Sequence, residues 1–165
     1  MAESTKFKTI PLRYSGVFDL SGLYYATKAW YTSVYATVNW EKLYKDKVSG
    51  PGVREVEINM VGFVKWDRYR RWVIEVSFKS WDIKEVVVDG KSVVQGRIEI
   101  KIDGQIDYDY ADMYTKNAKS KFVKLLGKIL QRVVKKDKDF AIKSKCEKEM
   151  MQLQTQFKKI LQMPA

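Results

Sequence analysis

Residues 65–72 (KWDRYRRW) place three arginines beside aromatic rings in one short segment. Guanidinium groups bind phosphates through paired hydrogen bonds, and Arg and Tyr side chains stack on nucleic-acid bases. Arg68, Tyr69, Arg70 and Arg71 are therefore candidate contacts to nucleic acid. The alternative is an ordinary charged turn with both flanking tryptophans in the core.

A second candidate is a row of cations in the last third of the chain. Its members are three or four residues apart: Lys121, Lys124, Lys128, Arg132 and Lys135. On a helix they share one side, which could follow the phosphates of a nucleic acid with salt-sensitive affinity. A solvated helix face is the alternative. The charge distribution favours binding, because residues 111–165 hold 14 Lys and Arg against 5 Asp and Glu, a net of +9 out of the chain's +11.

Four aspartates form the third candidate: Asp103, Asp107, Asp109 and Asp112. Paired carboxylates can hold Mg²⁺ or transfer protons. Their spacing does not match a calcium loop, and the first three share the outward face of a predicted strand, so polar alternation explains them. We predict no metal site and no cofactor.

The sequence lacks the residues of common enzyme chemistry. Histidine, the usual general base and the commonest metal ligand, is absent. No Gly-rich phosphate loop is present, and Cys146 has no histidine to activate it. We therefore expect a non-enzymatic protein.

Apolar residues at helical spacing accompany the lysines. One group shares a side of the predicted helix: Phe122, Leu126, Ile129, Leu130 and Val133. After a charged segment the pattern restarts at spacings of 4, 4, 3, 4 and 3, with Ile142, Cys146, Met150, Leu153, Phe157 and Ile160. We expect two helices, or one with a kink near Asp137.

Most of the second run, residues 142–160, matches a seam that a partner helix can use. The candidate protein-interaction residues, for example in a homodimer, are therefore Cys146, Met150, Leu153, Phe157 and Ile160, although the default role of Cys146 is a small buried hydrophobe.

The first part of the chain predicts strands and one early helix. Residues 6–17 form a strand with Pro11 at an edge or bulge, and a helix begins near Leu20 with Asp19 or Ser21 as its cap. Strands at 36–48 and 54–66 flank the turn at residues 49–52.

Strand parity predicts how the following strands pair. A three-residue loop at residues 67–69 pairs Trp66 with Arg70 and Val64 with Trp72, which keeps both apolar faces on one side. Asp89 and Gly90 close a hairpin. Gly104 is expected inside a continuous strand, as a bulge or twist point.

Together these elements predict one α+β domain over residues 1–165. Residues 1–112 supply an antiparallel sheet and one N-terminal helix, and residues 113–163 supply a long basic helical segment. This order resembles the helix-grip fold of the START-like, or Bet v 1-like, superfamily, in which a curved sheet wraps a long C-terminal helix. The segment GVFDL (residues 16–20), after a strand containing Pro11, also resembles small archaeal proteins of that fold. The chain departs from the pattern in having one early helix instead of two and a longer C-terminal segment.

Composition limits the class of protein and its expected location. A hydrophobic content of 45% argues against a disordered chain, and one cysteine excludes an intramolecular disulfide. No run approaches the about 18 apolar residues of a membrane span. The N-terminus lacks the apolar core of a signal peptide, so we expect a cytoplasmic protein.

A sequence pI near 9.6 favours a polyanionic partner. The leading hypothesis is a protein that binds RNA or a ribonucleoprotein such as the ribosome, with a ribosome-associated or translation-silencing role. One alternative, implied by the helix-grip resemblance, is a carrier of lipid or another apolar ligand. Another is a protein that binds an anionic membrane surface through its basic amphipathic helices.

Overall fold

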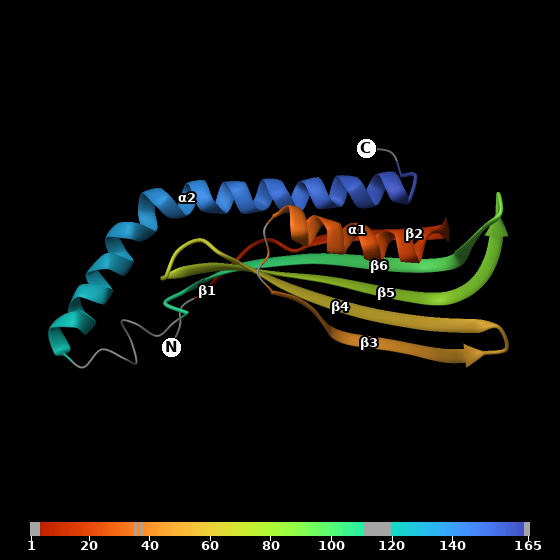
Figure 1. Ribbon diagram of the computed structural model, residues 1–165, viewed down its shortest axis with the longest axis horizontal. Helices are drawn as coiled ribbons and strands as arrows, with labels where there is room; N and C mark the ends of the chain where they lie inside the picture. Colours follow the sequence, from red (N-terminus) through yellow and green to blue (C-terminus); the bar gives the residue numbers. More distant parts are fainter. Residues whose placement is uncertain (1–3, 35, 37, 111–119, 164–165) are drawn as a thin grey trace.

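The computed structural model describes residues 4–34, 36, 38–110 and 120–163, with side chains at all of these positions except 38–40, 130–132 and 134–138. Two helices are described, α1 (Leu20–Ser33) and α2 (Lys121–Ile160). The strands are β1 (Ser4–Lys6), β2 (Ile10–Phe18), β3 (Val38–Gly50), β4 (Val53–Lys65), β5 (Arg70–Val88) and β6 (Lys91–Tyr108). The protein is thus of the α+β class with an antiparallel sheet, as the sequence predicts. The sheet is curved and open (Figure 1).

The sheet has the strand order β1-β6-β5-β4-β3, and β2 also pairs with β6. β2 lies along residues 94–102 of β6 and β1 along residues 105–107, so the two short strands run end to end on one edge of β6. Between them, the Phe7 amide donates to the carbonyl oxygen of Gly104 at 2.8 Å. Pro11 lies in β2, where an edge strand tolerates its missing N–H group.

The predicted strand pairings are confirmed. Val64 pairs with Trp72, and the Trp66 amide donates to the Arg70 carbonyl at 3.1 Å. The β5–β6 turn consists of Asp89 and Gly90, both with positive φ.

Gly104 does lie inside a continuous strand, but it is not a bulge, because it pairs with Ile74 in unbroken register. A Cβ atom at Gly104 would come within 2.7 Å of Met150 Sδ and 2.8 Å of Phe7 Cδ2. Glycine is therefore needed for close packing at this position.

The far end of the β5–β6 hairpin bends toward the helices (Figure 1). The register shifts between Trp81 and Lys84, and Asp82 has a φ of 55°. Such an irregularity bends a strand and increases its twist.

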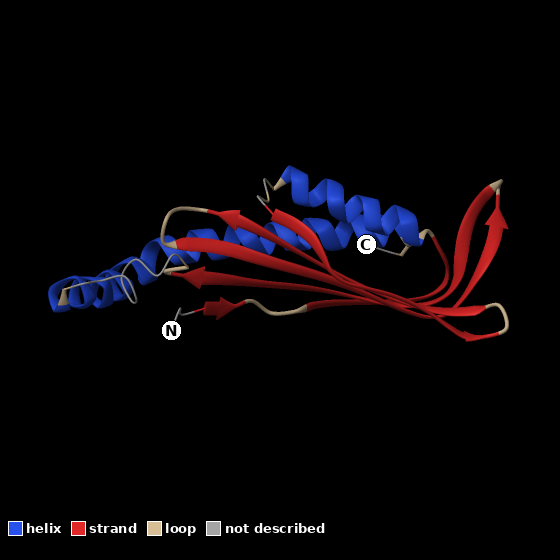
Figure 2. Ribbon diagram, turned by 60° about the horizontal axis from the view of Figure 1, so that its bottom comes forward, coloured by secondary structure: helices blue, strands red, loops and turns tan. Residues whose placement is uncertain are grey.

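Both helices lie on the same face of the sheet (Figure 2). Asp19 caps α1 by accepting a hydrogen bond from the Gly22 amide at 2.8 Å. The fully buried Tyr31 hydroxyl lies 3.0 Å from the Met60 carbonyl oxygen and 3.1 Å from that of Ile74, on two neighbouring strands. α1 is thereby fixed to the centre of the sheet.

α2 is one continuous helix that changes direction along its length (Figure 1). Its last part and the following Leu161 fill the core with side chains that are at most 1% exposed: Cys146, Met150, Leu153, Phe157 and Leu161. Phe157 packs against Phe78 with ring centroids 5.7 Å apart.

This packing corrects the prediction that Cys146, Met150, Leu153, Phe157 and Ile160 contact a partner. The first four are buried by their own chain, and Ile160 is half-buried against the same core. Burial also raises the pKa of the Cys146 thiol to about 12, so the thiol is unreactive at neutral pH.

Replacing Phe157 with alanine should lower the free energy of unfolding by about 3–5 kcal/mol, because it leaves a cavity under α2. Chemical denaturation measures the loss. Met151→Ala is the matched control on the same helix, since Met151 is exposed, and should change stability by less than about 0.5 kcal/mol. If both variants lost the same unfolding free energy, α2 would not be packed on the sheet through Phe157.

Candidate anion-binding surface

The β4–β5 turn is built around Asp67. Its Oδ1 atom accepts hydrogen bonds from the amides of Tyr69 and Arg70 at 2.8 and 2.7 Å, and its Oδ2 atom accepts from the Arg70 guanidinium at 2.7 and 3.0 Å. Partial burial acts to raise the pKa of Asp67, but these hydrogen bonds outweigh it, so the pKa is lowered. The turn is thus held by an ionised carboxylate.

Arg70 connects this turn to α2. Its other guanidinium nitrogen donates to Asp139 Oδ1 at 3.1 Å, and the Tyr108 hydroxyl donates to Asp139 Oδ2 at 3.0 Å. The Arg70 side chain is only 9% exposed. These contacts use the hydrogen-bonding capacity of Arg70 within the fold, which argues against the predicted contact of Arg70 with nucleic acid.

The remaining residues of the turn differ in accessibility. The Arg71 guanidinium pairs with Asp107 at 2.9 Å and lies over the rings of Phe63 and Tyr110. Tyr69 is half-buried, with its ring 6.0 Å from that of Tyr108. Arg68 is exposed, so it is the member of the predicted group that remains open to a ligand.

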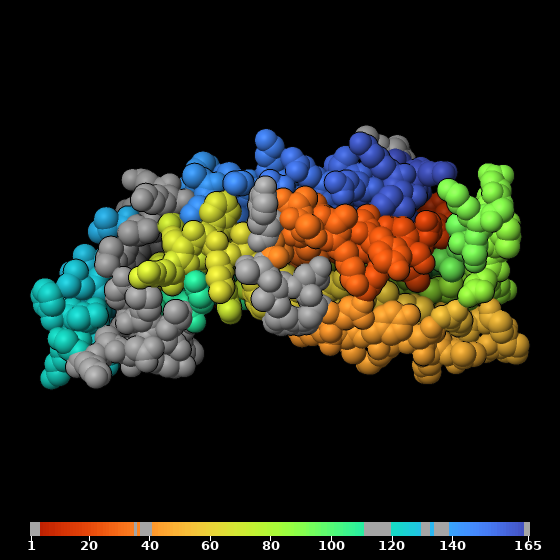
Figure 3. Space-filling model, in the orientation of Figure 1, coloured from red at the N-terminus to blue at the C-terminus, as the bar shows by residue number. Residues whose placement is uncertain are grey.

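The predicted lysine row begins on the first part of α2, residues 121–133, which we call the arm, and its last member, Lys135, lies just beyond it. The arm extends past the end of the sheet (Figure 1), and Figure 3 shows it at one extremity of the molecule. Lys121, Lys124 and Lys128 are exposed, and among the described residues no ion pair involves them. The side chains of Arg132 and Lys135 lie outside the described residues.

The sequence around the arm contains no counter-charge. Residues 113–136 include eight Lys or Arg and no Asp or Glu. Charges of one sign without neighbouring acids produce a strong local positive potential. The arm is therefore the surface best suited to hold an anion.

The arm also exposes large apolar side chains. Phe122 is 67% exposed, Ile129 51% and Val133 70%, and Leu125 and Leu126 are exposed as well. Scattered single hydrophobic residues are normal on a surface, but a contiguous group indicates an interaction site.

The four aspartates singled out from the sequence lie in different surroundings. Asp103 accepts a hydrogen bond from Thr9, and Asp107 pairs with Arg71. Asp109 is buried, and Asp112 lies outside the described residues. Within the described ranges, no group of three or more Cys, Asp or Glu side chains is placed to hold an ion.

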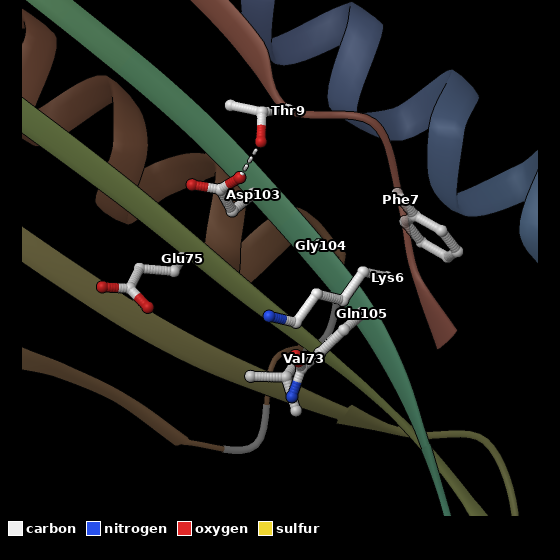
Figure 4. Close-up of a pocket in the computed structure, with 8 residues that line it drawn as sticks. All are labelled: Lys6, Phe7, Thr9, Val73, Glu75, Asp103, Gly104 and Gln105. Atoms are coloured by element: carbon white, nitrogen blue, oxygen red, sulfur yellow. Dashed lines mark hydrogen bonds between the residues drawn. The ribbon is translucent and has the colours of Figure 1, made fainter. Parts of the chain in front are cut away.

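A cavity of about 370 Å³ lies at the outward face of the sheet, where Lys6, Glu75, Asp103 and Gln105 meet (Figure 4). Glu75 and Asp103 are directly opposite in register. Glu75 has an ion pair with Lys42 at 3.7 Å, and Asp103 has Thr9, so both carboxylates already have partners. We assign no function to this cavity.

Comparison with known protein families finds no matching family model, and comparison with curated proteins finds no match. None of the helices in the described part of the chain is both long enough and apolar enough to cross a bilayer.

Two features of this surface were missed from the sequence. The Arg70–Asp139 pair joins residues 69 positions apart, and no local pattern indicates such a pairing. The exposure of the apolar side of the arm was also not predicted, although the absence of acids from residues 113–136 distinguishes the arm from the buried part of α2.

Replacing Asp67 with asparagine tests the turn through its pH dependence. Because the pKa of Asp67 is lowered in the folded protein, its stabilising contribution is complete above the aspartate pKa of the unfolded chain and is lost as the pH falls through the folded value. The difference in unfolding free energy between wild type and Asp67→Asn should be largest near neutral pH and shrink below about pH 4. Denaturation curves across this range measure it, and a difference that does not change with pH would contradict the ionised turn.

Proposed function

We propose that the protein is a non-enzymatic binding protein whose arm holds a polyanion. The observation that carries this proposal is the row of exposed lysines, Lys121, Lys124 and Lys128, with no ion pair among the described residues. Long charged side chains without acidic neighbours are free to exchange their counter-ions for an anionic ligand.

RNA and ribonucleoproteins, including the ribosome, are the polyanions that the lysine row by itself favours. The lysines are spaced to lie along a phosphate backbone. The turn between β4 and β5, which carries the exposed Arg68, lies at the same end of the molecule as the arm (Figure 1). A ribosome-associated or translation-silencing role, suggested by the resemblance to small archaeal proteins, remains a proposal that rests on analogy.

The helix-grip relationship also remains a proposal. It is supported by the last part of α2, which lies along one face of the curved sheet (Figure 2). The apolar-ligand carrier that this relationship implies needs a cavity between the sheet and the helix. Met150, Leu153 and Phe157 occupy that space with at most 1% exposure, so we favour polyanion binding over the carrier.

Salt-dependent binding to single-stranded RNA tests the proposal. The wild-type protein should bind poly(U) at low salt, and the logarithm of its affinity should fall linearly with the logarithm of the salt concentration. The triple variant Lys121→Gln, Lys124→Gln, Lys128→Gln should reduce the magnitude of this slope by about 2, because each phosphate contact to a single strand contributes about 0.7.

The matched control removes three exposed lysines elsewhere: Lys45→Gln, Lys47→Gln and Lys91→Gln. It lowers the net charge equally and should leave the slope nearly unchanged. If both triple variants lose affinity equally, the effect is one of net charge and the arm is not the site. An absence of binding at low salt to any polyanion would refute the proposed function.

A further inference from the structure

The chemistry of the arm extends beyond its lysines. Phe122, Leu126, Ile129 and Val133 follow one another at spacings of 4, 3 and 4, which places them on one side of the helix. All four are at least 40% exposed. Lys121, Lys124 and Lys128 fall on a different side, at spacings of 3 and 4. The arm is therefore an amphipathic helix whose described apolar and charged side chains are exposed to solvent.

Within the described part of the chain, the body of the protein does not cover the apolar side of the arm. The described side chains at residues 121–126, 128 and 129 are all exposed, and the arm departs from the sheet where α2 bends (Figure 1). An apolar surface of this kind is costly in water unless a partner covers it.

Three kinds of partner could bind the arm. They differ in how well they match its charged side and its apolar side. RNA would neutralise the lysines and leave Phe122 and Val133 in water. A second copy of the chain would cover the apolar side. It would also bring together two copies of residues 113–136, each with eight Lys or Arg and no Asp or Glu. An anionic bilayer matches both sides, since its headgroups neutralise lysines and its acyl boundary accepts apolar side chains.

We infer that the arm docks on the surface of an anionic phospholipid bilayer. The helix lies in the plane of the interface, with Phe122, Ile129 and Val133 inserted at the acyl boundary and the lysines at the level of the headgroups. This inference rests on the proposed polyanion-binding function and names the polyanion. The inference requires no membrane-crossing helix, because amphipathic helices of this kind bind along the membrane surface.

Vesicle flotation with the full chain tests the inference. The wild-type protein should float with vesicles of phosphatidylcholine mixed with phosphatidylglycerol, and should remain unbound with phosphatidylcholine alone. Phe122→Gln with Ile129→Gln should weaken binding roughly tenfold to a hundredfold, because two inserted side chains are lost. Replacing the three lysines with glutamine should weaken it on the order of a hundredfold.

Matched controls separate insertion from general effects. Val48→Gln with Val87→Gln removes two exposed apolar side chains at the opposite end of the sheet, and should float like the wild type. Glutamine is a good helix former, and circular dichroism should show unchanged helix content for every variant. The Phe122→Gln, Ile129→Gln variant should keep its affinity for poly(U), since its lysines are intact.

The outcomes that overturn the inference are distinct from failure of the proposed function. Salt-sensitive binding to poly(U) without flotation would overturn the inference and leave the proposed function in place. Flotation unaffected by Phe122→Gln with Ile129→Gln would also overturn it. So would a lipid-free dimer, seen by sedimentation velocity, that those two substitutions dissociate. Binding to neither poly(U) nor anionic vesicles would overturn both.

Discussion

The largely buried ion pair between Arg70 and Asp139 lies where α2 leaves the core. Removing two charges from water is costly unless both are fully hydrogen-bonded, and here Asp67 and Tyr108 supply the remaining partners. The pair attaches α2 to the end of the β4–β5 hairpin. Residues after this point lie on the sheet, whereas residues before it extend past the end of the sheet (Figure 1).

The two parts of α2 have the same apolar spacing and opposite surroundings. Phe122, Leu126, Ile129 and Val133 repeat at intervals of 4, 3 and 4, and so do Cys146, Met150, Leu153 and Phe157. The first group is exposed and the second is buried. The second part carries acidic residues such as Glu147 and Glu149, while the arm carries none. Charge, more than apolar periodicity, distinguishes the part of α2 that packs on the sheet from the exposed arm.

The sequence predicts the sheet better than the site, because strand pairing follows from local patterns, whereas the site depends on contacts between residues far apart in the chain. Alternation and turn length are local, so the pairing of Val64 with Trp72 and the continuous strand through Gly104 could be predicted. The need for glycine at position 104 could not be predicted, because it arises from contacts with Phe7 and Met150, which lie far away in the sequence. The same holds for Arg70, which looked accessible in its segment. Its distant partner Asp139 buries it, and only Arg68 of the predicted turn remains open.

The length of the β5–β6 hairpin places the two ends of the molecule far apart. A 19-residue strand such as β5 spans roughly 60 Å, and the Asp89–Gly90 turn lies at the end opposite the arm (Figure 1). A ligand bound at the arm, as we propose, would therefore lie far from the exposed Val87 and Val88 near that turn. The fold thus separates the arm from the β5–β6 turn by the length of the sheet.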